Sequence, residues 1–216
     1  MAIIPAQEKV FMVSNGTNTT YGGSASLKAM QQWYTMEDVT NTVRPYKVFT
    51  ALLTQSGEYQ PFDVYEGTDL YIGSTYVILS SGEGATGDFT NVGAPNNEEG
   101  TLFIATGTTP NSWGISYLQY DSGAPIATVL ENTIGDIWFG YGDTGVYLAS
   151  SNNLFTLNKT TVLMPNGYQN GPYYNIGVQY EDLNNSRITT SESTDGLNAP
   201  VNNVLTNTPI EIRVYN

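Results

Sequence analysis

The sequence predicts a mainly β protein, an antiparallel β-sandwich or jelly-roll-like domain with a short helical N-terminal extension. Its 16 Tyr residues, together with frequent Thr, Val and Ile, favour half-buried pleated surfaces. Its 22 Gly and 10 Pro residues suit a chain that turns often. Within residues 116–150, four short β-type runs are separated by turns that contain Gly, Asn or Pro: 116–120, 126–130, 136–139 and 145–148.

The chain is expected to divide into an N-terminal attachment and assembly region, 1–45, and a β-sandwich domain, 46–216. Residues 24–34 are the best helix candidate, because Leu27, Met30 and Tyr34 follow helical spacing after a capping Ser. An apolar arm, 1–13, precedes it across a polar linker, 14–23. The residues expected to mediate attachment are Ile3, Ile4, Phe11, Leu27, Met30, Trp33 and Tyr34.

Two other interpretations of this region remain open. The helical part could be a small hairpin that packs on the β domain, and the arm could add a strand to the chain's own sheet.

The first part of the β domain begins with a strand that is apolar on both faces. Residues 46–55 are therefore expected to form a central or inter-subunit strand. Residues 68–80 are expected to form two strands around Gly73 and Ser74, and 101–106 a buried strand. Residues 81–100 are expected to form a long acidic loop, and 108–114 a turn region.

The C-terminal part is expected to contain a hairpin, two further strands and a surface excursion. The hairpin joins 154–157 to 160–163 through Asn158 and Lys159. Residues 173–180 are expected to form a strand, and 181–203 to run over the surface without regular structure, because they are polar and lack periodicity. Residues 210–215 alternate cleanly, which predicts a half-buried strand. The predicted core residues are Ile126, Val129, Ile137, Phe139, Ile210, Ile212 and Val214.

The charge is strongly and unevenly negative, with a net value of −13. Up to Lys47, four basic residues accompany three acidic ones, whereas beyond it three basic residues accompany 17 acidic ones. Such a surface disfavours nucleic acid and anionic lipid as partners. No apolar run approaches the length of a membrane span and no signal-peptide pattern opens the chain, so we expect neither membrane insertion nor secretion.

The chain contains no Cys and no His. Disulfides, thiolate metal sites and the Ser-His and Cys-His nucleophile systems are therefore excluded. We expect no enzymatic activity, no cofactor and no metal site.

Carboxylates offer the remaining acid–base chemistry. Glu131 and Asp136 stand five residues apart, and Asp63, Glu66 and Asp69 cluster around Gly67. A glycosidase needs two suitably spaced carboxyls, one with a raised pKa. The alternative, which we favour, is a solvated acidic face. Calcium could be held at Asp121, at 98–99 or at 181–182, although no loop has EF-hand spacing.

Aromatic side chains beside Gly and Asn in expected loops are candidates for contact with a glycan. These residues are Trp113, Tyr168, Tyr173 and Tyr174. The interpretation that we favour for them is core or interface packing, in which Tyr and Trp are also common.

Several segments resemble those of a known class of proteins. Residues 46–57 (YKVFTALLTQSG) and 124–135 (APIATVLENTIG) resemble segments of small virion proteins of tailed bacteriophages. Residues 75–107 resemble an element of phage tail and fibre proteins, and 209–216 (PIEIRVYN) is similar to their C-terminal strand. The crAss-like phages of Bacteroidetes are one candidate group.

The resemblance implies a structural virion protein, namely a head fibre, tail fibre or decoration protein. It implies other virion proteins as partners, a homo-oligomer with a trimer favoured, and no catalytic residues. The alternative function is a receptor-binding module that recognises bacterial surface glycan.

Overall fold

The computed structural model describes residues 44–165, 173–194 and 197–216. Pro45–Asn216 forms one compact unit. The regular structure of the described part is strand, except for a single 3-10 turn, η1 (Thr90–Val92). The expected helix at 24–34 and the expected attachment residues between Ile3 and Tyr34 lie outside the described residues.

The first sheet contains the strand expected to be central. Its order is β11-β15-β1-β8, with every pair antiparallel. The strands are β1 (Tyr46–Thr54), β8 (Ile126–Asn132), β11 (Thr160–Leu163) and β15 (Thr208–Tyr215). Phe49, Ala51 and Leu53 of β1 point to one side and are buried, as side-chain alternation along a strand requires. The predicted alternation of β15 is confirmed, because Ile210 and Ile212 are buried on the same side as these β1 residues.

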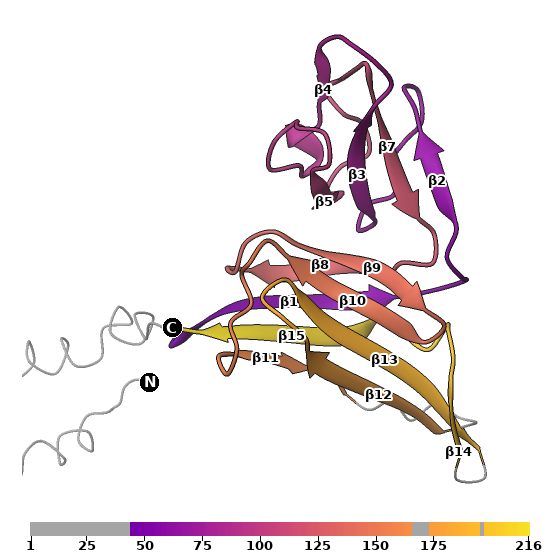
Figure 1. Cartoon of the computed structure of the whole chain (residues 1–216), viewed down its shortest axis with the longest axis vertical. Helices are drawn as coiled ribbons and strands as arrows, with labels where there is room; N and C mark the ends of the chain where they lie inside the picture. The colour runs from indigo at the N-terminus through magenta and orange to yellow at the C-terminus, as the bar shows by residue number, and fades with distance from the viewer. Residues whose placement is uncertain (1–43, 166–172, 195–196) are drawn as a thin grey trace, which may run out of the picture. The chain divides into compact units, whose positions relative to one another are not determined.

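The second sheet packs against that buried face. Its order is β12-β13-β10-β9, and β14 (Leu197–Pro200) pairs with β13. The strands are β9 (Ile137–Asp143), β10 (Val146–Ser151), β12 (Tyr173–Tyr180) and β13 (Asn185–Thr194). One hydrophobic core unites both sheets, and within it the rings of Phe49 and Phe139 lie 6.0 Å apart. The two sheets form a β-sandwich (Figure 1). The predicted fold class of the β domain is confirmed.

The chain between β1 and β8 forms an inserted β unit with a core of its own. A four-stranded sheet of order β2-β7-β3-β5 contains β2 (Pro61–Val64), β3 (Thr75–Ser80), β5 (Leu102–Ile104) and β7 (Ser116–Asp121). A two-stranded sheet pairs β4 (Thr86–Asp88) with β6 (Ser112–Gly114). The core of this unit includes Tyr76, Ile78, Phe89 and Trp113. The domain expected as a single sandwich thus contains two hydrophobic cores.

Backbone contacts join the inserted unit to the sandwich. The amide of Ala127 in β8 donates to the carbonyl of Gly73 at 2.9 Å, and the amide of Phe139 donates to Thr75 Oγ1 at 3.0 Å. Gly73 has a φ of +89°, and a Cβ at this position would lie 2.6 Å from the carbonyl oxygen of Ala127. Glycine is therefore the residue that this junction requires.

Several expected elements differ from the structure. The four runs of 116–150 are strands, but they are distributed over three sheets. Residues 68–74 are irregular apart from a turn at 72–73, so the expected pair of strands around Gly73 reduces to β3. The expected acidic loop contains β4 and η1, and the expected turn region contains β6.

The predicted hairpin around Asn158 is wrong. Residues 154–157 are not a strand, and β11 pairs with β15 instead. Asn158 still makes a turn, with a φ of +64°.

The segment expected as a surface excursion, 181–203, contains β13, which lies between β12 and β10 in the second sheet. Its buried positions are largely hydroxyl residues: Ser186 and Thr190 are buried beside Ile188. Because these buried residues are polar, the sequence shows no apolar alternation that would predict this strand.

Two predicted core residues are also corrected. Ile126 is 40% exposed because it alternates with buried Ala127 and so points away from the core. Val129 is 41% exposed although it is opposite buried Ala51, because β8 is the edge strand of its sheet. A bulge between Thr50 and Ala51 in the β1–β8 pairing leaves Leu130 without a partner in the register. Val214 is half-buried, whereas Ile137, Phe139, Ile210 and Ile212 are buried as predicted.

Candidate binding surface

The outward face of the inserted four-stranded sheet is the surface with the clearest binding chemistry. Val64, Leu118 and Ile78 point into the core of the unit, so their neighbours along each strand point outward. We name this surface the Tyr65 face. It is defined by Asp63, Tyr65, Val77, Leu79, Tyr117 and Gln119.

Two tyrosine rings form the aromatic part of the Tyr65 face. Tyr65 follows the last residue of β2, and Tyr117 lies in the adjacent strand β7. Their rings stack with centroids 5.3 Å apart and planes inclined by 22°. Tyr65 is 55% exposed and Tyr117 is half-buried. The stacked pair therefore presents a rigid aromatic surface to solvent.

A carboxylate and an amide lie beside the rings. Asp63 and Gln119 are directly opposite in the β2–β7 register, and Gln119 Nε2 donates to Asp63 Oδ1 at 2.8 Å. The pKa of Tyr65 is raised, mainly by desolvation of its phenol and next by the negative charge of Asp63. A hydrogen bond to Asp63 raises the pKa further. The phenol therefore remains protonated at neutral pH. Asp63 keeps further lone pairs for a ligand, since a carboxylate has about four acceptor sites.

Apolar side chains extend the Tyr65 face across the sheet. Val77 and Leu79 of β3 are half-buried. In the β3–β7 register Val77 is opposite Gln119 and Leu79 is opposite Tyr117, so all four side chains point to the outward face. An antiparallel sheet that faces water usually carries polar side chains on that side. An exposed apolar and aromatic sheet face is instead typical of a binding surface.

Of the aromatic residues expected to contact a glycan, the two whose side chains the structure describes, Trp113 and Tyr174, lie in different cores. Trp113 is buried, with its ring packed edge-on against Phe89 at 5.5 Å, so it has the core-packing role that we favoured. Tyr174 is half-buried against the sandwich core. Tyr168 and the side chain of Tyr173 lie outside the described residues.

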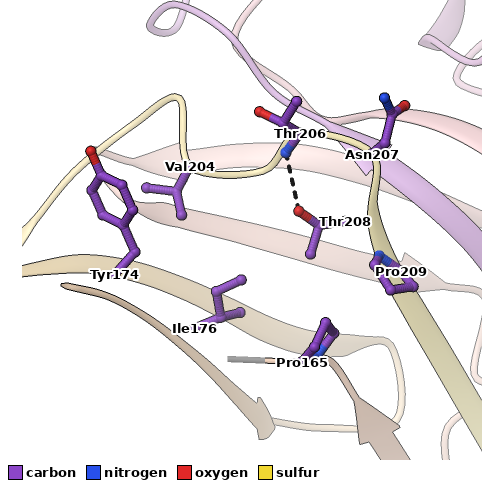
Figure 2. A pocket seen from close by; sticks show the side chains of 8 residues that line it. All are labelled: Pro165, Tyr174, Ile176, Val204, Thr206, Asn207, Thr208 and Pro209. Carbon is purple, nitrogen blue, oxygen red and sulfur yellow. Dashed lines mark hydrogen bonds between the residues drawn. The ribbon is translucent and has the colours of Figure 1, made fainter. Parts of the chain in front are cut away.

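Tyr174 borders a small pocket at the edge of the sandwich. Its volume is about 140 Å³, and Figure 2 shows Tyr174 at one end and Pro209 at the other. Most of the lining is apolar, and the backbone amide of Thr206 donates to Thr208 Oγ1 at 3.0 Å. This pocket has room for one small apolar group and offers few free polar groups to orient a ligand.

The carboxylates considered for acid–base or metal chemistry have other roles where their contacts are known. Asp121 Oδ1 accepts the amides of Gln60 and Gly123, both at 2.9 Å. The backbone amide and side chain of neighbouring Asn residues lower the pKa of Asp182, which is the opposite of what a general acid needs. Glu131 lies on β8, and Asp136 is exposed in the turn before β9.

Among the described residues, no group of three or more acidic side chains could hold a metal ion. Within the same residues, no helix is long and apolar enough to cross a membrane.

The Tyr65 face was not found in the sequence because its partners are distant in the chain. In the sequence, Asp63 stands out only as a member of the carboxylate group with Glu66 and Asp69. In the structure it accepts a hydrogen bond from Gln119, 56 residues later. Comparisons of the chain with protein-family models, curated proteins and solved structures gave no match.

Proposed function

We propose that this chain is a non-enzymatic structural protein of a tailed-bacteriophage virion, acting as a head fibre, tail fibre or decoration protein. One observation carries the proposal. Three of the four segments that resemble phage virion proteins, 46–57, 124–135 and 209–216, are far apart in the sequence but coincide with β1, β8 and β15, which are adjacent strands of one sheet. The fourth, 75–107, lies in the inserted unit.

Assembly with further copies of the chain belongs to the same proposal, with a trimer favoured. The edge strand β8 exposes Leu130 to 62%, besides Ile126 and Val129. A groove of about 400 Å³ crosses the same sheet from β8 to β11, lined in part by Leu130, Leu163 and Met164. Exposed apolar side chains on an edge strand favour association, and a second copy is the occupant that we propose.

Attachment to other virion proteins is assigned in this proposal to residues 1–45. Their nearly balanced charge and apolar arm contrast with the acidic remainder of the chain. An acidic domain repels its neighbours except at matched contacts and so suits display in solvent.

The decisive experiment is to locate the protein on particles. Purified particles that incorporate a tagged chain should show it by mass spectrometry and by labelled electron microscopy. A chain that lacks residues 1–23 should remain folded and fail to incorporate. If this shortened chain still joins particles but loses thermal stability, the arm is internal and the attachment role is wrong. If the full-length chain is absent from particles, the virion proposal fails.

Oligomeric state has a separate test. The mass of the purified protein in solution should correspond to a trimer, and Leu130→Lys should lower it. Gln179→Lys, at an exposed position of β12 in the other sheet, is the matched control. A monomeric wild-type protein would refute assembly through the β8 edge.

A further inference from the structure

We propose that the Tyr65 face binds neutral pyranose sugars of a glycan chain. The inference starts from two features that occur together. A stacked tyrosine pair is exposed to solvent, and a carboxylate paired with an amide lies directly beside it on the same face.

These groups match the two sides of a sugar ring. A pyranose has a patch of C–H bonds on its ring face, which packs on the electron-rich face of an aromatic ring. Its equatorial hydroxyls point outward and can both donate and accept hydrogen bonds. Asp63 can accept from two neighbouring hydroxyls, and the remaining N–H of Gln119 can donate to a third.

A protein partner fits this surface less well. The centre of a protein interface is depleted of charged residues, because burying a carboxylate that lacks sufficient partners is unfavourable. Asp63 lies within the Tyr65 face, where its carboxylate is hydrogen-bonded by the Gln119 amide and the Tyr65 phenol and keeps further acceptor sites. A sugar would supply hydroxyl donors to this carboxylate and would leave part of it in contact with water.

The charge of the protein selects neutral over anionic sugars. Beyond Lys47 the chain carries 17 acidic and three basic residues, and Asp63 itself lies at the centre of the surface. A glycan that contains uronic acids or phosphate would therefore be repelled. The expected ligand class is a neutral hexose or pentose oligomer.

The test measures binding of defined oligosaccharides to the isolated full-length chain by saturation-transfer NMR and calorimetry. The probes are maltohexaose, cellohexaose, mannohexaose and xylohexaose, with oligogalacturonate as the anionic comparison. At least one neutral probe should bind, and oligogalacturonate should not. Tyr65→Ala should weaken binding by about two- to tenfold, the range for an aromatic contact. Asp63→Ala should weaken it by about tenfold or more, because the hydrogen bonds to its charge are lost.

Tyr59→Ala is the matched control, since Tyr59 is 63% exposed but belongs to a different surface, 6.5 Å from the Tyr141 ring. It should leave affinity unchanged. Circular dichroism and the unfolding midpoint should establish that Tyr65→Ala and Asp63→Ala remain folded. Failure of all four neutral probes to bind overturns the proposal, as does equal affinity in wild type and Tyr65→Ala.

Sedimentation distinguishes the competing role of the surface. If the wild-type protein sediments as an oligomer and the Tyr65→Ala variant sediments as a monomer, the Tyr65 face is an interface between copies and the sugar proposal is wrong. The sugar proposal uses no particles and does not depend on the virion role, so either can fail while the other stands.

Discussion

Gln55 is the residue whose replacement should most clearly test how the two cores are held together. It follows β1 at the point where the chain leaves the sandwich, and its side chain is buried. Its Nε2 donates to the carbonyls of Gly57 at 2.9 Å and Gly123 at 3.1 Å, at the two ends of the inserted unit. Its Oε1 accepts from Tyr147 Oη and from the amide of Asn203, both at 2.7 Å. All four hydrogen-bonding positions of the amide group are therefore used.

Gln55→Leu removes these four hydrogen bonds at similar volume. The carbonyl of Gly123 is on a buried residue and would be left without this donor, which costs about 1–3 kcal/mol. Gly57 and Asn203 are exposed and can bind water, so each loses the ordinary net value of about 1 kcal/mol. Tyr147 keeps a contact with Asn202 Oδ1 at 3.0 Å. We therefore expect a loss of about 3–5 kcal/mol in the free energy of unfolding.

Urea unfolding followed by tryptophan fluorescence measures this loss in each core. Trp113 belongs to the inserted core and Trp138 packs against the sandwich core, so variants that retain one of them and lack Trp33 report on one core each. Gln55→Leu should lower the midpoint for both reporters. Gln179→Leu, at an exposed position of β12, is the matched control and should change stability by less than about 0.5 kcal/mol. A loss below about 1 kcal/mol for Gln55→Leu would refute the reasoning.

Two further predictions concern the sandwich core and the loops of the inserted unit. Phe139→Ala should destabilise by about 3–5 kcal/mol, whereas Val129→Ala, on the exposed edge strand, should cost less than about 1 kcal/mol; equal losses in urea unfolding would contradict the edge assignment. Hydrogen bonds from Thr90 and Asn111 lower the pKa of Asp88 below its ordinary value of 3.8. The stability that Asp88 contributes is therefore complete above about pH 3.8 and is lost as the pH falls further. Thermal scans between about pH 5 and pH 2 should show a smaller decrease for Asp88→Asn than for wild type, and parallel decreases would exclude this role.

Much of the strand content could be predicted because apolar alternation reports burial directly. In β15, Ile210 and Ile212 alternate with Glu211 and Arg213, and no other assignment fits that pattern. In β1 the apolar run predicted a central or inter-subunit strand, and β1 is central, between β15 and β8. The local apolar pattern of these strands is enough to predict them, without knowledge of their contacts with distant residues.

The features that were missed depend on contacts between distant residues. β13 buries Ser186 and Thr190, and because these side chains are polar the strand has no apolar alternation in the sequence. Its place in the sheet depends on pairing with β12 and β10. Val129 belongs to an apolar run, but exposure at a sheet edge depends on which strand has no outer neighbour. The Tyr65 face arises for the same reason, because Asp63 and Gln119 meet only when β2 pairs with β7.

The position of the Tyr65 face in the inserted unit has a consequence for how function and stability are divided. The sandwich core contains none of the six residues of the face, and the inserted unit has its own core beneath it. Gln55 contacts both ends of the insertion but none of the face. Variants of Tyr65 should therefore alter binding without changing the sandwich, whereas variants of Gln55 should alter stability in both cores. In the display role that we propose, this separation would allow the ligand contacts to vary while the sheet formed by β15, β1 and β8 is kept.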